Sequence, residues 1–142
     1  MKRIIFGFIL LITGMAYGQS LVLADGRAIQ KGWAALTAGG TACASGSAVT
    51  TSQTVGFDVS AGIPKNHTIQ LVVTGGPATC TAQLCGSIDG GTTWGSLSGD
   101  QTCTSSVMFH VDARPALMVK VSLSALTGGT SPTVMPIYVG GR

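Results

Sequence analysis

The chain has 142 residues, of which 45% are hydrophobic, 9% are charged and 21 are glycine, and it contains no glutamate. This composition disfavours helices, which need better helix formers, and it disfavours disorder, which needs low hydrophobicity and high charge. The formal net charge is only +3. We therefore expect neither nucleic acid nor an acidic membrane surface as a partner.

The N-terminus, residues 1–18, has the pattern of a signal peptide. Two basic residues precede an apolar stretch over residues 4–12, and the small residues of Ala16-Tyr17-Gly18 are typical of a cleavage site. The apolar stretch is shorter than the roughly 20 residues that cross a bilayer as a helix. We predict cleavage before Gln19 and a secreted chain in the periplasm, on the cell surface or outside the cell. An uncleaved membrane anchor is the alternative.

Four cysteines in an exported chain predict two disulfides in an oxidising compartment. They are Cys43, Cys80, Cys85 and Cys103. Cys80 and Cys85 are five positions apart at an apparent strand start, so their side chains face opposite sides and do not pair easily. This favours the pairs Cys85–Cys103 and Cys43–Cys80. Zinc bound by the four thiolates is the alternative, although only one pair has a suitable spacing.

The segment 19–52 is rich in small and polar residues and is expected to form an extended arm with edge strands and loops. It contains few large apolar side chains, and Trp33 is one of them. Residues 54–139, by contrast, alternate strongly enough to form a core alone. We therefore divide the exported chain into this arm and a β-sandwich over residues 53–142, which together form one domain.

Hydrophobic residues at every second position predict a series of strands after the arm. The predicted strands cover residues 54–59, 68–74, 81–88, 107–112, 117–124 and 133–139. Glycine-rich turns separate them, and Pro136 in the last one indicates a sheet edge or a bulge. About seven or eight short strands without a helix predict an all-β, antiparallel, jelly-roll-like β-sandwich. A small β-barrel is the alternative.

Residues 87–94 follow the pattern S-x-D-x-G-x-T-W, which resembles the Asp-box hairpin of sialidase-like propellers. In this motif Asp89 can accept hydrogen bonds from turn amides, Gly91 can adopt a positive φ, and Trp94 can pack over the hairpin. A propeller needs several copies, and this chain has one. We therefore interpret the motif as a structural turn without sialidase activity, formed by Ser87, Asp89, Gly91, Thr93 and Trp94.

A wider resemblance covers residues 67–142. A strand ending in the Asp-box motif, a strand within residues 116–126, the turn-rich segment 127–134 and a terminal strand are similar to small jelly-roll modules of bacteriophages and prophages. Those modules resemble galactose-binding-like sandwiches and serve as virion decoration, fibre or adsorption components. The resemblance implies a structural or adhesion role. The signal peptide departs from it, because virion parts normally assemble in the cytoplasm, and so favours a secreted surface protein.

The residues that carry catalysis in other proteins lack a recognisable catalytic pattern here. His67 and His110 are expected to be exposed and non-catalytic, and the G-x-S-x-G motif of serine hydrolases is missing. Asp58, Asp89 and Asp100 lack the spacing of a calcium-binding loop. We therefore predict a protein that is not an enzyme and that needs neither a metal nor another cofactor.

These features predict a secreted, non-enzymatic β-sandwich, related to phage or prophage structural and adhesion components, that binds a surface glycan or protein or assembles with other subunits. A carbohydrate-binding module is the alternative, in which Trp94 or Trp33 stacks on a sugar ring. In an assembly, residues 20–52 would add a strand to a neighbouring copy and form a homo-oligomer. A secreted hydrolase is the third hypothesis.

Overall fold

The computed structural model describes residues 21–22, 28–44, 49–57 and 62–141, so the predicted signal peptide lies outside the described residues. Those residues form strands and no helix, and hence no helix that could cross a membrane. The strands are β1 (Leu21–Val22), β2 (Ala28–Gly32), β3 (Val55–Gly56), β4 (Asn66–Thr74), β5 (Thr79–Ser87), β6 (Gly95–Ser96), β7 (Gln101–Thr102), β8 (Val107–Val111), β9 (Met118–Thr127) and β10 (Thr133–Gly141).

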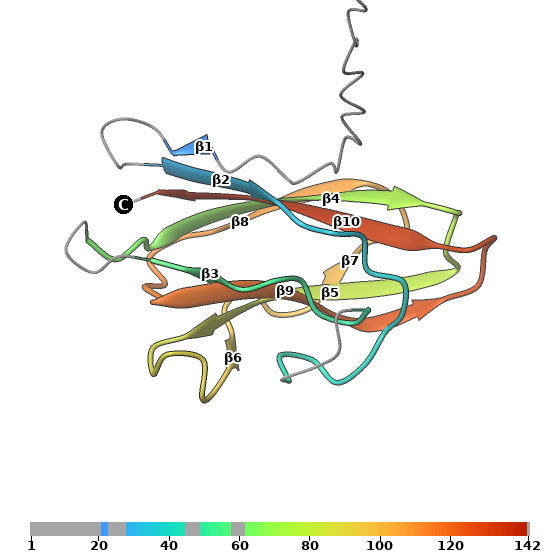
Figure 1. Cartoon of the computed structure of the whole chain (residues 1–142). Helices are drawn as coiled ribbons and strands as arrows, with labels where there is room; N and C mark the ends of the chain where they lie inside the picture. Colours follow the sequence, from blue (N-terminus) through green and yellow to red (C-terminus); the bar gives the residue numbers. More distant parts are fainter. Residues whose placement is uncertain (1–20, 23–27, 45–48, 58–61, 142) are drawn as a thin grey trace, which may run out of the picture.

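The strands form two antiparallel sheets that pack face to face (Figure 1). One sheet has the order β1-β2-β10-β4-β8, and the other has the order β3-β9-β5-β6, with β7 also paired to β5. The pairs are nested along the chain, because β2 pairs with β10, β3 with β9, β4 with β8, and β5 with β6 and β7. Nested antiparallel pairs in two sheets are the arrangement of a jelly roll. The predicted all-β sandwich is confirmed.

The core lies between the sheets and is formed by alternate residues of the long strands. In β9, Val119, Val121 and Leu123 are fully buried in the core, whereas the residues between them lie on the outer face of the sheet. In β4, Ile69 and Leu71 face the core in the same way. The period of two that predicted these strands therefore also identifies their buried faces.

The described part of the segment 19–52 belongs to this sandwich. Strand β2 pairs with β10, and the side chains of Trp33 and Leu36 lie in the core. The rings of Trp33 and Tyr138 pack with their centroids 5.7 Å apart. In the folded chain, therefore, residues 54–139 do not supply the whole core, because Trp33 and Leu36 of the N-terminal segment contribute to it.

Pro136 lies within β10, between β4 and β2, and not in an edge strand. Regular pairing with β2 stops at Gly32. Beyond it the Trp33 amide donates to the Pro136 carbonyl over 3.0 Å, and Leu36 exchanges two backbone hydrogen bonds with Val134. The opposite chain thus bulges beside the proline, where a missing N–H interrupts no regular ladder. Of the two predicted positions, the bulge is observed.

The two disulfides lie on opposite faces of β5. Cys80 faces the core and bonds Cys103, whereas Cys85 lies on the outer face and bonds Cys43. The predicted pairs Cys85–Cys103 and Cys43–Cys80 are wrong, because β7 returns to the first half of β5, where the Cys103 amide donates to the Cys80 carbonyl over 3.0 Å. The prediction that Cys80 and Cys85 do not bond each other is confirmed. Two disulfides are compatible with an oxidising compartment.

Candidate functional site

The Asp-box turn leads from β5 to β6 and is organised by Asp89. The carboxylate accepts hydrogen bonds from the Thr93 hydroxyl over 2.6 Å, from the Thr93 amide over 2.9 Å and from the Ser87 hydroxyl over 2.7 Å. The Ser87 oxygen accepts a further bond from the amide of Gly91, whose φ is 89°. The bonds from Thr93, followed by that from Ser87, lower the pKa of Asp89 to about 2. The carboxylate is thus engaged in shaping the turn.

The turn places Trp94 against Lys120 on the outer face of β9. The Nζ atom of Lys120 lies 4.2 Å from the centroid of the indole ring, which is a cation–π distance. Gly91 lies against the edge of the same indole, so Trp94 packs over the hairpin, as the sequence motif predicts. The side chain of Trp94 is half-buried. The turn therefore supports an aromatic ring beside a cationic group.

Lys120 is held from a second direction by the loop that contains Cys43. Its ammonium group donates a hydrogen bond to the carbonyl of Ala44. Cys85 is the register partner of Lys120 across β5 and β9, so the Cys43–Cys85 disulfide fixes that loop beside the lysine. Together the loop and the turn leave Lys120 only 4% exposed.

The charge of Lys120 has no acidic partner among the described residues. His110 contacts Asp112 over 2.7 Å in another part of the molecule, and no described carboxylate lies within ion-pair distance of Lys120. Burial lowers the pKa of the Lys120 ammonium from its ordinary value. A cation that is largely removed from water is thus compensated by one carbonyl group and one aromatic face.

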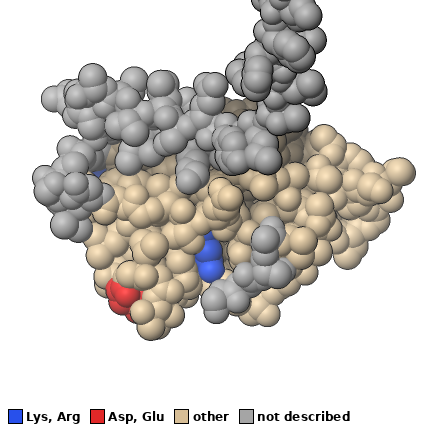
Figure 2. All heavy atoms as spheres, in the orientation of Figure 1, with Lys and Arg blue, Asp and Glu red and all other residues tan. Residues whose placement is uncertain are grey.

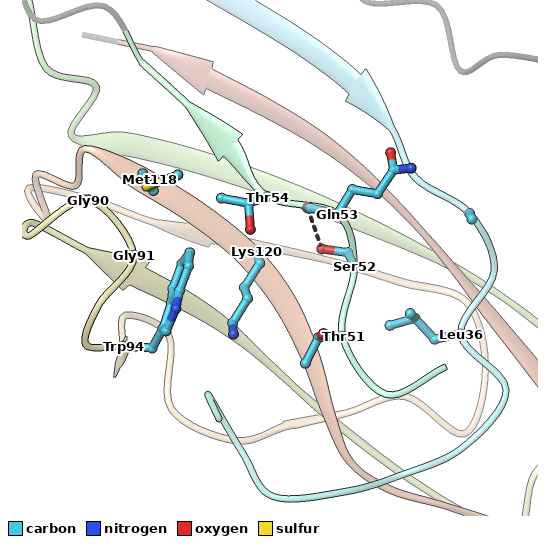
Figure 3. A pocket seen from close by; sticks show the side chains of 11 residues that line it. Leu36, Thr51, Ser52, Gln53, Thr54, Gly90, Gly91, Trp94, Met118 and Lys120 are labelled. Carbon is cyan, nitrogen blue, oxygen red and sulfur yellow. Dashed lines mark hydrogen bonds between the residues drawn. The ribbon is translucent and has the colours of Figure 1, made fainter. Parts of the chain in front are cut away.

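Trp94 and Lys120 line a cleft of about 500 Å³ (Figure 3). Met118 continues the wall formed by β9, and the chain at residues 51–54 forms the opposite wall, to which Gln53 and Thr54 contribute polar side chains, whereas the Ser52 hydroxyl is bonded to the Gln53 carbonyl and the Val121 amide. In Figure 3 these residues lie across the cleft from the indole. The cleft therefore combines an aromatic ring, an ammonium group and neutral hydrogen-bonding groups.

Trp33, the other tryptophan proposed to bind a sugar, does not reach this cleft. Its side chain is 3% exposed and packs in the core, where its indole N–H has no hydrogen-bond partner among the described residues. A ring buried between two sheets cannot stack on a ligand, so this prediction is wrong. Of the two tryptophans, only Trp94 lines the cleft.

His67 is fully buried, contrary to the predicted exposure. Its Nε2–H donates to the carbonyl of Arg114 over 2.8 Å, which leaves Nδ1 as the acceptor for the Tyr138 hydroxyl, also over 2.8 Å. Burial lowers the pKa of the imidazole. The alternation of β4 contained the missed signal. His67 lies an even number of positions from Ile69 and Leu71, so its side chain points to the same core face of the strand.

The remaining sequence candidates do not join the cleft. His110 is exposed, as predicted, and bonds both Asp112 and the Thr68 hydroxyl on the outer face of the other sheet. Asp58 lies outside the described residues. Within the described part of the chain, no group of three or more His, Cys, Asp or Glu side chains could hold a metal ion.

Comparison with models of known protein families, with curated proteins and with solved structures finds no match to this chain. The resemblance to phage and prophage modules therefore stays a prediction from the sequence.

Proposed function

We propose that this protein is a secreted, non-enzymatic β-sandwich that binds a surface glycan in the cleft beside Trp94. The observation that carries the proposal is a half-buried indole in a cleft of about 500 Å³ that neutral polar groups also line. Sugar rings present apolar C–H faces and many hydroxyl groups, so an aromatic ring with a few polar neighbours suits them. Binding of this kind fits the adhesion role expected from the sequence.

The chemistry of the lining supports binding rather than hydrolysis. Among the described residues of the cleft, Lys120 is the only one with a titratable side chain. Glycoside hydrolysis generally uses two carboxyl groups beside the scissile bond. The nearby carboxylate of Asp89 is already hydrogen-bonded within its own turn. A hydrolase is therefore the weaker hypothesis for this site.

Assembly with other subunits is a second function that the sequence suggested, through a strand donated by residues 20–52. The described residues of that segment are used within their own sandwich, since β2 pairs with β10 and Leu36 is in the core. A strand that already completes its own sheet is poorly placed to complete another. The glycan-binding proposal is therefore preferred over strand donation.

Trp94→Ala tests the glycan proposal on an immobilised panel of neutral and acidic polysaccharides. We expect wild-type protein to bind at least one polysaccharide and the variant to bind it at least tenfold more weakly, because the stacking surface is lost. Ile88→Ala is the matched control, since Ile88 is 74% exposed in the same turn and does not line the cleft. Full retention of binding by a folded Trp94→Ala variant would rule out this site.

Secretion and oxidation are tested by mass spectrometry of the protein exported by its native host. We expect a chain that begins at Gln19, has no free thiol and yields disulfide-linked peptides for Cys43–Cys85 and Cys80–Cys103. An intact N-terminus in the secreted fraction would contradict cleavage. Thiols that can be alkylated without a reductant would contradict the oxidised state.

A further inference from the structure

We infer that the glycan bound in this cleft is acidic and that Lys120 binds a carboxylate carried by its sugar ring. The inference rests on the proposed function and adds the chemical class of the ligand. It starts from the contrast between a cation inside the cleft and the lack of a described carboxylate within ion-pair distance of it, since the nearby Asp89 carboxylate is bonded within its own turn.

The ammonium group of Lys120 has three N–H donors and one positive charge to compensate. One carbonyl oxygen, from Ala44, accepts a hydrogen bond, and the indole of Trp94 faces the Nζ atom. Neither group carries a formal charge. A buried charge without a counter-charge is costly, so an anion that enters the cleft gains more there than it would beside an exposed lysine.

The position of Lys120 is fixed before any ligand arrives. The register with Cys85, the disulfide to Cys43 and the contact with Trp94 come from three different parts of the chain. A long side chain that is already ordered loses little further entropy on binding. Lys65, in contrast, is exposed and lines no part of the cleft, as is usual for lysine.

The surroundings of the cleft favour one negative charge within a mainly neutral ligand. Figure 2 shows basic atoms near the middle of this face and acidic atoms at one corner, with uncharged residues over most of its described remainder. Gln53 and Thr54 add neutral polar groups to the opposite wall. This combination fits a sugar ring with several hydroxyl groups and a single carboxylate, such as a uronic acid.

A purely structural role for Lys120 makes different predictions. If the lysine served only to join Ala44 to Trp94, its removal would destabilise the fold and weaken all ligands equally. A recognition role predicts instead that removing the charge changes the preference between acidic and neutral sugars. The decisive quantity is therefore a ratio of two affinities for the same protein.

The experiment compares carboxylated polysaccharides with their own carboxyl-reduced forms. Polygalacturonate, alginate and hyaluronan are used, because reduction converts each uronic acid to a neutral sugar with the same ring and linkage. Dissociation constants are measured for the wild type, for Lys120→Met and for Lys65→Met as the matched control. We expect at least one acidic form to bind wild type and Lys65→Met at least tenfold more tightly than its reduced form. In Lys120→Met the ratio should fall to about one.

The outcomes separate this inference from the proposed function. Equal binding of acidic and reduced forms by the wild type, or a preference that survives in Lys120→Met, would overturn the role of Lys120 and leave glycan binding intact. Binding to no polysaccharide in either form would overturn both proposals. Should Lys120→Met fail to fold, the salt dependence of wild-type binding decides, because only the acidic form should weaken with added salt if the contact is ionic. Equal salt dependence of the two forms would overturn the inference.

Discussion

His67 and Lys120 are both basic side chains that the fold removes from water, but they lie in different parts of the molecule. His67 lies between the sheets, where the hydroxyl of Tyr138 and the carbonyl of Arg114 satisfy both ring nitrogens. Lys120 lies on the outer face of β9, where one carbonyl and an aromatic face surround a charge. In the core, both ring nitrogens of His67 have hydrogen-bond partners. In the cleft, the ammonium group of Lys120 keeps N–H donors and a positive charge that a ligand can satisfy.

The two environments also arise in different ways. Burial of His67 follows from the alternation of β4, since every second residue of that strand faces the other sheet. Burial of Lys120 requires two segments that fold over an outer face, namely the Cys43 loop and the Asp-box turn. Stability should therefore depend on His67, and ligand recognition should depend on Lys120.

The largest effect is expected from removing the outer disulfide with the double variant Cys43→Ala/Cys85→Ala. Its loop spans 42 residues, for which the chain-entropy model gives a loss of about 4 kcal/mol in the free energy of unfolding. Glycan binding should also weaken, because Ala44 is no longer held beside Lys120. Urea unfolding and the polysaccharide panel measure the two effects.

The core disulfide is the matched control for that variant. Cys80→Ala/Cys103→Ala opens a loop of 23 residues, with a loss of about 3 kcal/mol on the same basis. This disulfide lies on the opposite face of β5, so binding should be retained wherever the protein stays folded. Equal loss of binding in both double variants would show that the outer disulfide has no special role at the cleft.

His67→Leu should lower the free energy of unfolding by about 3 kcal/mol, because it leaves a buried hydroxyl and a buried carbonyl without their partner. Adding Tyr138→Phe should recover about 1 kcal/mol, since it removes one of the two unsatisfied groups. Urea unfolding of the single and double variants measures both values. A loss well below 1 kcal/mol for His67→Leu would show that the hydrogen bonds of His67 contribute little to the stability of the core.

The pH dependence of stability should carry a contribution from His67. Burial keeps its pKa below the ordinary 6.5, so the unfolded chain binds the proton more readily. The stabilisation is fully present above about pH 6.5 and is lost as the pH falls through the pKa of the folded protein, by up to about 1.4 kcal/mol per pH unit. Urea unfolding at pH 7.5 and 5.5 measures the slope.

Two histidine variants identify the source of that slope. His110→Asn should keep most of the pH dependence, because burial is the largest cause of the lowered pKa of His67 and the charge of His110 is a smaller one. His67→Leu should remove it. A slope of the same size in both variants would assign the pH dependence to other groups.

The smallest effect on stability is expected from Lys120→Met, within about 1 kcal/mol in either direction. The variant loses a hydrogen bond and a cation–π contact, but it also removes a buried charge, and replacing buried charges by apolar groups of similar size is often neutral or stabilising. Thermal and urea unfolding measure the change. A loss as large as that of His67→Leu would remove the distinction between the core and the cleft.

The fold could be predicted from the sequence because its strands alternate. The predicted strand over residues 107–112 differs from β8 by one residue, and that over 133–139 starts where β10 starts. The same rule places His67 on the core face, but its polar character led to the prediction of an exposed residue. At this position the polar character of the side chain and the alternation of the strand indicated opposite environments, and the alternation was the better guide to burial.

The cleft could be predicted only in part. The Asp-box pattern identified Trp94, because the turn is local in sequence and its hydrogen bonds join residues four or fewer positions apart. Lys120 was missed, because parity places it on the outer face and the segments that cover it are distant in the sequence. The cysteine pairs were wrong for the same reason, since the return of β7 to the start of β5 is a tertiary feature.

Nested strand pairs also determine the order in which this chain can fold. The outermost pair joins Ala28 to Gly141, whereas the innermost pair joins β5 to β6 across the Asp-box turn. Closing distant residues first would cost the most loop entropy, so folding should be slow overall and should begin near the inner turn. We therefore predict that Asp89 belongs to the folding nucleus. Its replacement by alanine should slow refolding while leaving the unfolding rate nearly unchanged, which stopped-flow kinetics can measure.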